Sequence, residues 1–449
     1  MAAICTPLTL VSRDLPFDKP SDLPDIFTSY RKSVEPLRDA PRAVVSTPTS
    51  LPPMPSFLSS QNPPFVIPET FEKLELSLMR PFSTKPCISD PPPFPSGVQS
   101  AHPFSGGSTT GLRRIRSLIR SGVMSRYKDT RNGLLGTEFS TKLSAWLSLG
   151  CITARQIHSQ LLDYEEGRDE QYRSAEGYGS GENSGTAAVR FELLWRDYMR
   201  LCTRKFGARL FRLEGFRNDS SYAWKTPGGK GSDPEVTEML ERFLRGTTGT
   251  GLIDASQREL LLTGYTSNRA RQNVASYLTK HLGINWKLGA EWYECMLVDY
   301  DLSSNWGNWQ YVAGVGNDPR GEARVFNPIK QSCDYDPQGE YCKAWVEELR
   351  GLEEPQEIFQ AWKVDIERRS ELGLDGLEMV ERPLKKIDFK VGGKGKGVGS
   401  GGGRYGGSGR GRTYGHGEGG RGRGGGNLGP RGGFRGRGRR DRGDRGDRG

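Results

Sequence analysis

The chain has 449 residues, of which 34% are hydrophobic, and it holds 60 glycines and 28 prolines, so we expect two or three domains and a part that stays outside any packed core. No apolar run approaches the roughly 18 residues of a membrane span, and the N-terminus lacks the basic and apolar regions of a secretory leader. The seven cysteines contain no CxxC pair and the four histidines are scattered, which predicts reduced thiols, an intracellular location and no metal site.

The net charge of +10 originates at the end of the chain. Residues 391–449 hold 15 Lys and Arg against 4 Asp and Glu, whereas the first 390 residues hold 49 against 50. Repeated RGG and GRG in residues 391–449 predict a disordered tail whose arginines contact the phosphates and bases of RNA or single-stranded DNA. A tail that only improves solubility is the alternative.

In chain order, residues 1–40 predict a surface turn and a short helix from about Ile26 to Val34. Residues 41–110 are rich in Pro, Ser and Thr and predict an interdomain linker. In residues 111–350 apolar positions recur every three or four residues without alternating strand runs, which predicts an all-α domain. Residues 351–390 predict a charged linker, part helical and part extended.

Three patterns in the helical region suggest a site for a polar, planar ligand. Ser140, Thr141 and Ser144 surround Lys142 at the start of a helix, where hydroxyls and free amides favour a phosphate, although a simple helix cap is the plainer interpretation. Glu192, Trp195 and Arg196 share one helix face and could grip a nucleobase, or belong to an amphipathic helix with a half-buried indole.

The third pattern is an amide and a guanidinium, Asn268 and Arg271, near the start of a helical run, with Asp299 as the candidate partner of the guanidinium. Trp286 and Trp309 lie in the flanking helical segments. They are either core packing or a chain of redox sites that passes an electron inward.

Six ordered blocks across residues 111–345 closely resemble the flavin-binding domain of the photolyase/cryptochrome family, and within it cryptochrome DASH of fungal type. The blocks are STKLSAWLSLG, ELLWRDYMR, GLIDASQREL, TGYTSNRARQNVASYL, GAEWYECMLVDYDLSSNWGNWQYVAGVGNDPR and FNPIKQSCDYDPQGEY. The resemblance implies a U-shaped FAD inside an all-α bundle.

Carried over by position, the resemblance assigns roles to individual residues. The diphosphate is expected at Tyr127, Ser140, Thr141, Lys142, Leu143 and Ser144. Glu192, Arg196 and Asn268 are expected to line the cavity, Arg271 and Asp299 to pair beside the isoalloxazine, Asp301 to meet the ribose or the flavin, and Asn305 to face flavin N5. Trp309, Trp286 and Trp224 are expected as the proximal, middle and distal members of a photoreduction chain.

The same resemblance predicts a pocket for a flipped cyclobutane pyrimidine dimer at Glu192, Trp195, Asn268 and Tyr311. Tyr311 stands where duplex-repairing photolyases carry Trp, and Gln272 where they carry Met. A smaller, more polar wall favours single-stranded DNA, because extrusion from a duplex costs a few kcal/mol. The histidines of (6-4) photolyases are absent, so that activity is not expected.

The family begins with an α/β domain that helps to seat an antenna 5,10-methenyltetrahydrofolate. No strand–helix alternation precedes Asp14, so antenna binding is doubtful, and residues 1–40 resemble the segment that follows that domain. A truncated sequence and a genuine short form both stay open.

Three functions follow: a light-driven enzyme that repairs dimers, a blue-light photoreceptor without repair, and an RNA- or ssDNA-binding protein that acts through its tail with an inert flavin domain. We expect a monomer in the nucleus, the cytoplasm or an organelle, without a membrane partner.

Overall fold

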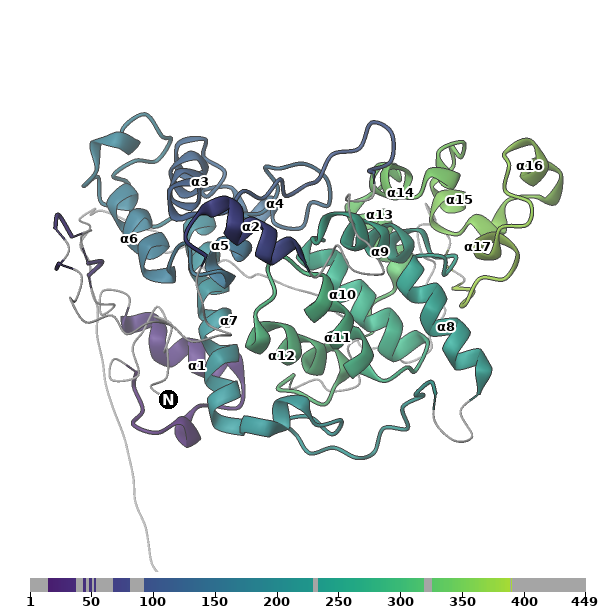
Figure 1. The fold of residues 1–449 in the computed structure, drawn as a ribbon, viewed down its shortest axis with the longest axis horizontal. Coiled ribbons are helices and arrows are strands. Elements are labelled where there is room, and N and C mark those ends of the chain that lie inside the picture. Colours follow the sequence, from purple (N-terminus) through teal and green to yellow (C-terminus); the bar gives the residue numbers. More distant parts are fainter. Residues whose placement is uncertain are drawn as a thin grey trace, which may run out of the picture. The chain divides into compact units, whose positions relative to one another are not determined.

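The described part of the chain is built from helices, which confirms the all-α expectation (Figure 1). The computed structural model describes residues 15–37, 43–45, 48–50, 52–53, 68–80, 93–228, 233–318, 325–387 and 389. Within these ranges the one β-type pairing is an isolated bridge between Lys225 and Ile284. All described residues belong to one unit, Met1–Gly393, and the tail expected at 391–449 lies outside them.

The α-helices are numbered in chain order, and short 3-10 turns connect several of them. Their bounds are α1 (Phe27–Val34), α2 (Phe71–Met79), α3 (Ser108–Arg120), α4 (Tyr127–Thr130), α5 (Ser144–Ser148), α6 (Ala154–Glu165), α7 (Ser184–Phe206), α8 (Pro234–Arg245), α9 (Gly251–Thr263), α10 (Asn268–Ser276), α11 (Trp286–Met296), α12 (Leu302–Ala313), α13 (Pro328–Tyr335), α14 (Glu340–Trp345), α15 (Pro355–Phe359), α16 (Ile366–Glu371) and α17 (Glu378–Glu381).

The helices that carry the predicted site residues begin at polar caps. Asn183 accepts hydrogen bonds from two backbone N–H groups at the start of α7, Ser267 from one at the start of α10, and Asp301 from one at the start of α12. Each cap satisfies amides that have no partner inside the helix, so the sequence fixes where these three helices start.

Three hydrophobic clusters hold the helices together. The first joins α1 and α7 to α8 through α12, the second joins α3 through α7, and the third joins α9 to α13, α14, α15 and α17. Helix α7 contributes to the first two clusters and α9 to the first and third, so both helices tie separate parts of the core together.

The interpretation of residues 351–390 as a linker is wrong for the described part of that segment. Leu352, Ile358, Phe359, Leu374 and Val380 are each at most 1% exposed and belong to the third cluster. The helices in this segment are only four to six residues long. Such short helices do not repeat the apolar spacing long enough to reveal a buried face.

The boundary at residue 110 is also placed too late. His102 is 5% exposed, and its ring packs on Trp146 and Tyr265. Helix α3 starts at Ser108, and Trp146 donates a hydrogen bond to the carbonyl oxygen of Ser105 at 3.1 Å. The proline-rich composition therefore led to a linker prediction for a segment that is packed from about residue 98 onward.

The predicted helix near Ile26–Val34 is present as α1, and it is packed rather than peripheral. Phe27, Tyr30 and Val34 are buried in the first cluster against α7. The interpretation of residues 1–40 as a remnant of another segment stays a prediction, but the described residues 15–37 form part of this core.

Candidate functional site

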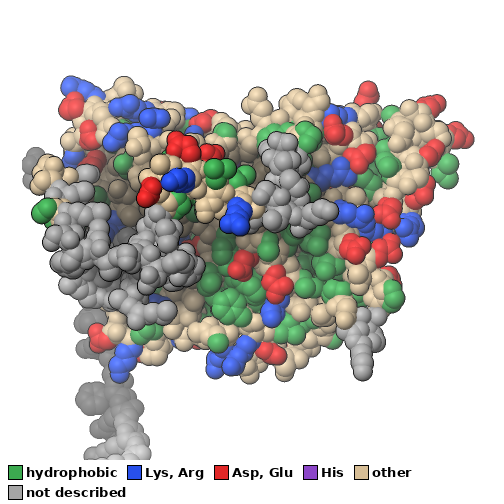
Figure 2. Space-filling model, viewed as in Figure 1, with side chains coloured by type: hydrophobic (Ala, Val, Ile, Leu, Met, Phe, Trp, Pro, Cys, Tyr) green, Lys and Arg blue, Asp and Glu red, His purple; other side chains and the backbone are tan. Residues whose placement is uncertain are grey.

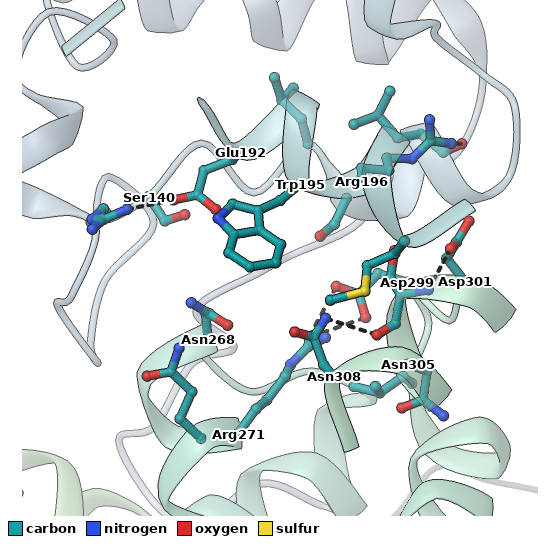
Figure 3. Close-up of a pocket in the computed structure, with 18 of the residues that line it drawn as sticks. Ser140, Glu192, Trp195, Arg196, Asn268, Arg271, Asp299, Asp301, Asn305 and Asn308 are labelled. Atoms are coloured by element: carbon teal, nitrogen blue, oxygen red, sulfur yellow. Dashed lines mark hydrogen bonds and ion pairs between the residues drawn. The ribbon is translucent and has the colours of Figure 1, made fainter. Parts of the chain in front are cut away.

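One cavity of about 570 Å³ brings the predicted site residues together (Figure 3). Helices α5, α7, α10 and α12 and the loops before them supply most of its wall. All the residues expected at the cofactor line it, namely Tyr127, Ser140, Thr141, Lys142, Leu143, Ser144, Glu192, Arg196, Asn268, Arg271, Asp299, Asp301 and Asn305. Trp195, Trp309 and Tyr311 line it as well, whereas Trp286 and Trp224 do not. Segments far apart in the sequence therefore meet at one site, although the individual roles remain predictions.

The expected ion pair is present in the wall. The Arg271 guanidinium donates to both carboxylate oxygens of Asp299, at 2.9 and 3.1 Å, and its Nε donates to the carbonyl oxygen of Thr266. The Asp299 side chain is 3% exposed. Burial lowers the pKa of Arg271, but the attraction of Asp299 and its hydrogen bonds outweigh burial and leave the pKa above its ordinary value. The pair fixes the Arg271 guanidinium in the cavity wall, with its charge balanced by Asp299.

The loop before α5 has a backbone suited to an anion. Ser140 and Lys142 have positive φ angles of 66° and 53°, and Leu143 follows in a right-handed conformation. Alternation of left- and right-handed residues turns successive N–H groups toward one concave surface, which binds anions. Helix α5 also starts without a side-chain cap. Helix α5 has only five residues, so its dipole is weak support for a phosphate site. The backbone shape of the loop supports such a site better.

Lys142 holds this loop together. Its ammonium donates to the carbonyl oxygens of Gly136, at 2.8 Å, and Phe139. Burial, together with the charge of Arg114, lowers the pKa of Lys142 to about 8. The lysine therefore stabilises the turn that presents the N–H groups, rather than offering a free charge.

The face of α7 that lines the cavity presents an acid and an indole. Glu192 pairs with Arg131, and burial raises the pKa of Glu192 against the opposing attraction of that arginine. Trp195 lies edge-on to Tyr311, with ring centroids 5.7 Å apart at 85°. Asn268 also faces the cavity (Figure 3). These groups offer stacking and hydrogen bonding to a base.

On α12, polar residues one turn apart face the same cavity. Asp301 accepts from Arg200 at 2.7 Å and caps the helix. Burial raises the pKa of Asp301, but the hydrogen bond and charge of Arg200 prevail and leave that pKa below its ordinary value. Asn305 donates from Nδ2 to the carbonyl oxygen of Ala290 at 2.9 Å, which leaves its Oδ1 as the remaining polar atom.

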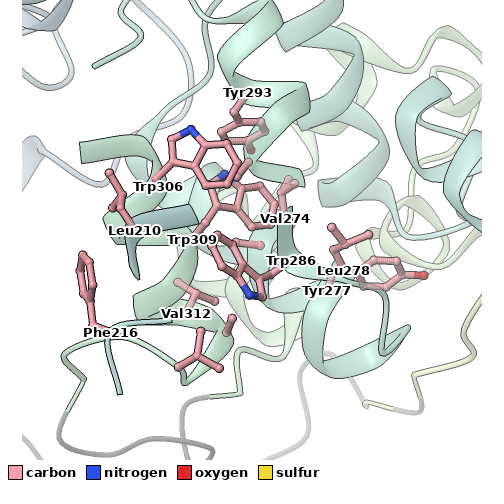
Figure 4. Packing of buried hydrophobic residues seen from close by; sticks show 14 of the residues in the cluster. Leu210, Phe216, Val274, Tyr277, Leu278, Trp286, Tyr293, Trp306, Trp309 and Val312 are labelled. Atoms are coloured by element: carbon pink, nitrogen blue, oxygen red, sulfur yellow. The ribbon is translucent and has the colours of Figure 1, made fainter. Parts of the chain in front are cut away.

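The tryptophans extend from this wall into the core (Figure 4). Trp309 lines the cavity and packs on Tyr293, and Gly289 makes room for it, because a Cβ there would lie 2.2 Å from its ring. Trp286 is fully buried, and its Nε1 donates to the carbonyl oxygen of Leu213.

The indole in ring contact with Trp286 is Trp306, at 5.7 Å between centroids. Trp224 instead stacks on Tyr222, at 5.2 Å. Its neighbour Lys225 is hydrogen-bonded to the backbone of Gly283 and Asn285, just before α11. The distal role of Trp224 stays a prediction, and sequence reasoning missed Trp306.

Other cavity residues were missed for different reasons. Asn308 lines the cavity one helical turn after Asn305, so helical spacing could have found it. Arg200 does not line the cavity, but it follows Arg196 by one turn and holds Asp301. Arg131 has no such local signal, because it meets Glu192 only through the packing of α4 on α7.

The described ranges show two further absences. They contain no group of three or more His, Cys, Asp and Glu that could hold a metal ion. Their helices are too short or too polar for any of them to cross a membrane.

Comparison with known proteins places the fold and the cavity in a class. Residues 189–384 match the FAD binding domain of DNA photolyase. A Neurospora crassa protein, named provisionally as a mitochondrial cryptochrome DASH, is 53% identical over 85% of this chain and 54% of its own length. Cryptochrome DASH of Gloeobacter violaceus is 42% identical over 78% of this chain and 61% of its own. The crystal structure of a Synechocystis cryptochrome covers 82% of this chain and 66% of its own, at 37% identity and a TM-score of 0.67.

The class is therefore that of the helical FAD-binding domains of photolyases. The chain belongs to the photolyase/cryptochrome family, in its cryptochrome DASH group. It spans somewhat more than half the length of the curated relatives that it matches.

Proposed function

We propose that this chain binds FAD in the cavity and uses blue light to drive an electron transfer that reverses cyclobutane pyrimidine dimers in single-stranded DNA. The observation that supports this function best is that one cavity combines two sets of groups. The loop before α5 and the Arg271–Asp299 pair suit a flavin dinucleotide, and Glu192, Trp195 and Asn268 suit a displaced base.

The residues fit FAD at both of its ends. Lys142 and Leu143 shape a concave array of N–H groups that suits a diphosphate. Arg271, held by the buried Asp299, provides a fixed cation beside a ring system. Bound FAD supplies a light-absorbing electron carrier, which none of the amino-acid side chains can replace at these wavelengths.

The tryptophans give the core oxidisable rings that lead away from the cavity. Trp309 forms part of the wall, and Trp286 lies fully buried behind it. Burial of both indoles keeps water away from them. We assign Trp309 and Trp286 to the first two positions of the electron path and keep Trp224 as the third.

The residues on the substrate side of the cavity bind and orient the pyrimidine dimer. Trp195 and Tyr311 are nearly perpendicular and form two walls of a wedge that can hold stacked pyrimidines. Glu192 is held at this wall by Arg131, and its carboxylate can accept a hydrogen bond from a pyrimidine N–H. Gln272, bound to Arg269, adds a polar edge that suits a base already free of a duplex.

The direct test is light-dependent repair of a single-stranded oligonucleotide that carries one thymine dimer. FAD-loaded protein should restore the undamaged strand in blue light and not in darkness, and Trp195→Ala should reduce repair. Trp362→Ala is a matched control, since Trp362 lies away from the cavity and stacks with Lys363 and Lys386. Photoreduction without repair would contradict the enzyme and favour a photoreceptor that uses the same path.

The compartment is a separate proposal. The Neurospora crassa relative carries a mitochondrial name, which supports a site of action inside the cell and an organelle as one candidate. Fractionation of cells that express the tagged chain would separate organelle, nucleus and cytoplasm.

A further inference from the structure

A residue of the N-terminal segment covers one face of the Trp195 indole. The ring of Phe27, on α1, stacks on the Trp195 indole with centroids 3.7 Å apart and planes 12° from parallel. Phe27 is 6% exposed, whereas Trp195 is only partly buried and lines the cavity. One face of the indole is therefore covered, and the surface left over faces the site.

Aromatic side chains of α7 hold the Phe27 ring in this orientation. Phe191 meets it edge-on at 5.2 Å and 86°, and Tyr198 meets it edge-on at 5.5 Å and 69°. Edge-to-face contacts favour one relative orientation of the rings, so the stack has little freedom to rotate.

Hydrogen bonds tie the same segment to α7. The Tyr198 hydroxyl donates to the carbonyl oxygen of Asp25 at 2.6 Å and accepts from Asn317 at 3.0 Å. The Lys205 ammonium donates to the carbonyl oxygen of Leu23 at 2.6 Å and pairs with the Asp25 carboxylate at 2.7 Å. Phe27 is therefore anchored through its own backbone segment and not only through its ring.

We propose that Phe27 is a positioning residue for Trp195, and that residues 15–37 thereby form part of the base-binding site. A partly exposed indole with neither face covered would have to be ordered when a base stacks on it, whereas the indole covered by Phe27 is already held in place. Ordering one side chain on binding weakens affinity by about 2- to 10-fold. This inference rests on the proposed dimer-binding function.

The first experiment compares variants for their preference for damaged DNA. The affinity of FAD-loaded protein for a single-stranded oligonucleotide with one thymine dimer is divided by its affinity for the undamaged strand. Phe27→Leu should lower this ratio by about 2- to 10-fold while FAD content stays unchanged. Val34→Ala is the matched control, because Val34 is buried on the same helix and has no ring to stack on Trp195.

Phe27→Tyr keeps the aromatic ring and should keep the wild-type preference for the damaged strand. This variant provides a second comparison if Phe27→Leu folds poorly. A wild-type ratio in Phe27→Leu, alongside a reduced ratio in Trp195→Ala, would overturn the inference and leave the proposed function standing.

A second readout needs no DNA. Protein labelled with 5-fluorotryptophan gives a fluorine NMR signal for Trp195, assigned by its loss in Trp195→Phe. Phe27→Leu should broaden or split that signal, and Val34→Ala should not. An unchanged signal in Phe27→Leu would overturn the inference. The Trp195 signal could also change in Phe27→Leu while the wild-type protein shows no preference for dimer-containing DNA. That result would support the positioning role and contradict the proposed function.

Discussion

Asp299 is the residue on which the cavity wall depends most for charge balance. Its side chain is 3% exposed and it neutralises Arg271, which also faces the cavity. Asp299→Asn would leave the guanidinium without a counter-charge, and breaking a buried pair in this way costs about 3–5 kcal/mol. Because Arg271 is 24% exposed, we expect the lower part of that range.

Chemical unfolding followed by circular dichroism would measure this loss, and titration with FAD should show weaker binding. Glu138→Gln is the control, because Glu138 is 59% exposed in its pair with Arg114, and such pairs contribute about 0–1 kcal/mol. Equal effects of the two substitutions would contradict a central role for Asp299.

Glu259 gives the fold a pH dependence. Burial raises its pKa from 4.5 to about 7, against the opposing effects of Tyr341, Thr266, Lys142 and Arg271, and Tyr341 donates to its Oε2 at 2.6 Å. The folded chain thus keeps this proton over a pH range in which the unfolded chain releases it. The free energy of unfolding should fall as pH rises from 4.5 to about 7, and then stay level.

Glu259→Gln should remove that decline, whose size is on the order of 3 kcal/mol. Urea unfolding at several pH values would measure it. Parallel pH profiles for the two proteins would show that Glu259 does not titrate as its buried position requires.

At this scale the sequence predicted residues that lie in recognisable blocks, and it missed pairs made by packing. Arg271 and Asp299 stand in such blocks, and the structure places them in contact. Phe27 and Trp195 are far apart in the chain, and no local spacing relates them. Their contact exists only after α1 packs on α7.

Among the elements, the long capped helices were predictable and the short ones were not. Helix α7 runs for 23 residues and shows its apolar spacing repeatedly. The segment from α15 to α17 contains helices of four to six residues, and its apolar side chains become visible as core only in the third cluster.

A truncation tests this correction. A chain that ends at Arg350 loses buried residues such as Leu352, Phe359 and Leu374, each worth about 1.5–3 kcal/mol. Since whole domains are stable by about 5–15 kcal/mol, the shortened chain should fail to unfold cooperatively. A chain that ends at residue 390 is the control and should behave like the full chain in a thermal melt. A cooperative melt of the shorter chain at the same temperature would restore the linker interpretation.

For the whole molecule, composition separates a body whose charges nearly cancel from a basic tail. Acidic and basic side chains are interspersed over the face shown in Figure 2, as expected for a body whose charges nearly cancel. The excess of positive charge belongs to residues 391–449, outside the described residues.

Deletion of residues 391–449 should therefore weaken binding to undamaged RNA and reduce the dependence of that binding on salt, since arginines release counterions from phosphates. Dimer repair in a short oligonucleotide should survive the deletion. Fluorescence anisotropy at several salt concentrations measures the first effect. An RNA affinity that does not change when residues 391–449 are deleted would contradict the assignment of RNA binding to the tail.

The central claim is that this chain forms a working flavin site, and an absorbance spectrum tests it most directly. Purified protein, supplied with FAD and freed of excess cofactor, should show the visible bands of oxidised flavin in darkness. Those bands should bleach under blue light with a reductant, and more slowly in Trp309→Phe. Protein that stays colourless after FAD is added would contradict the account.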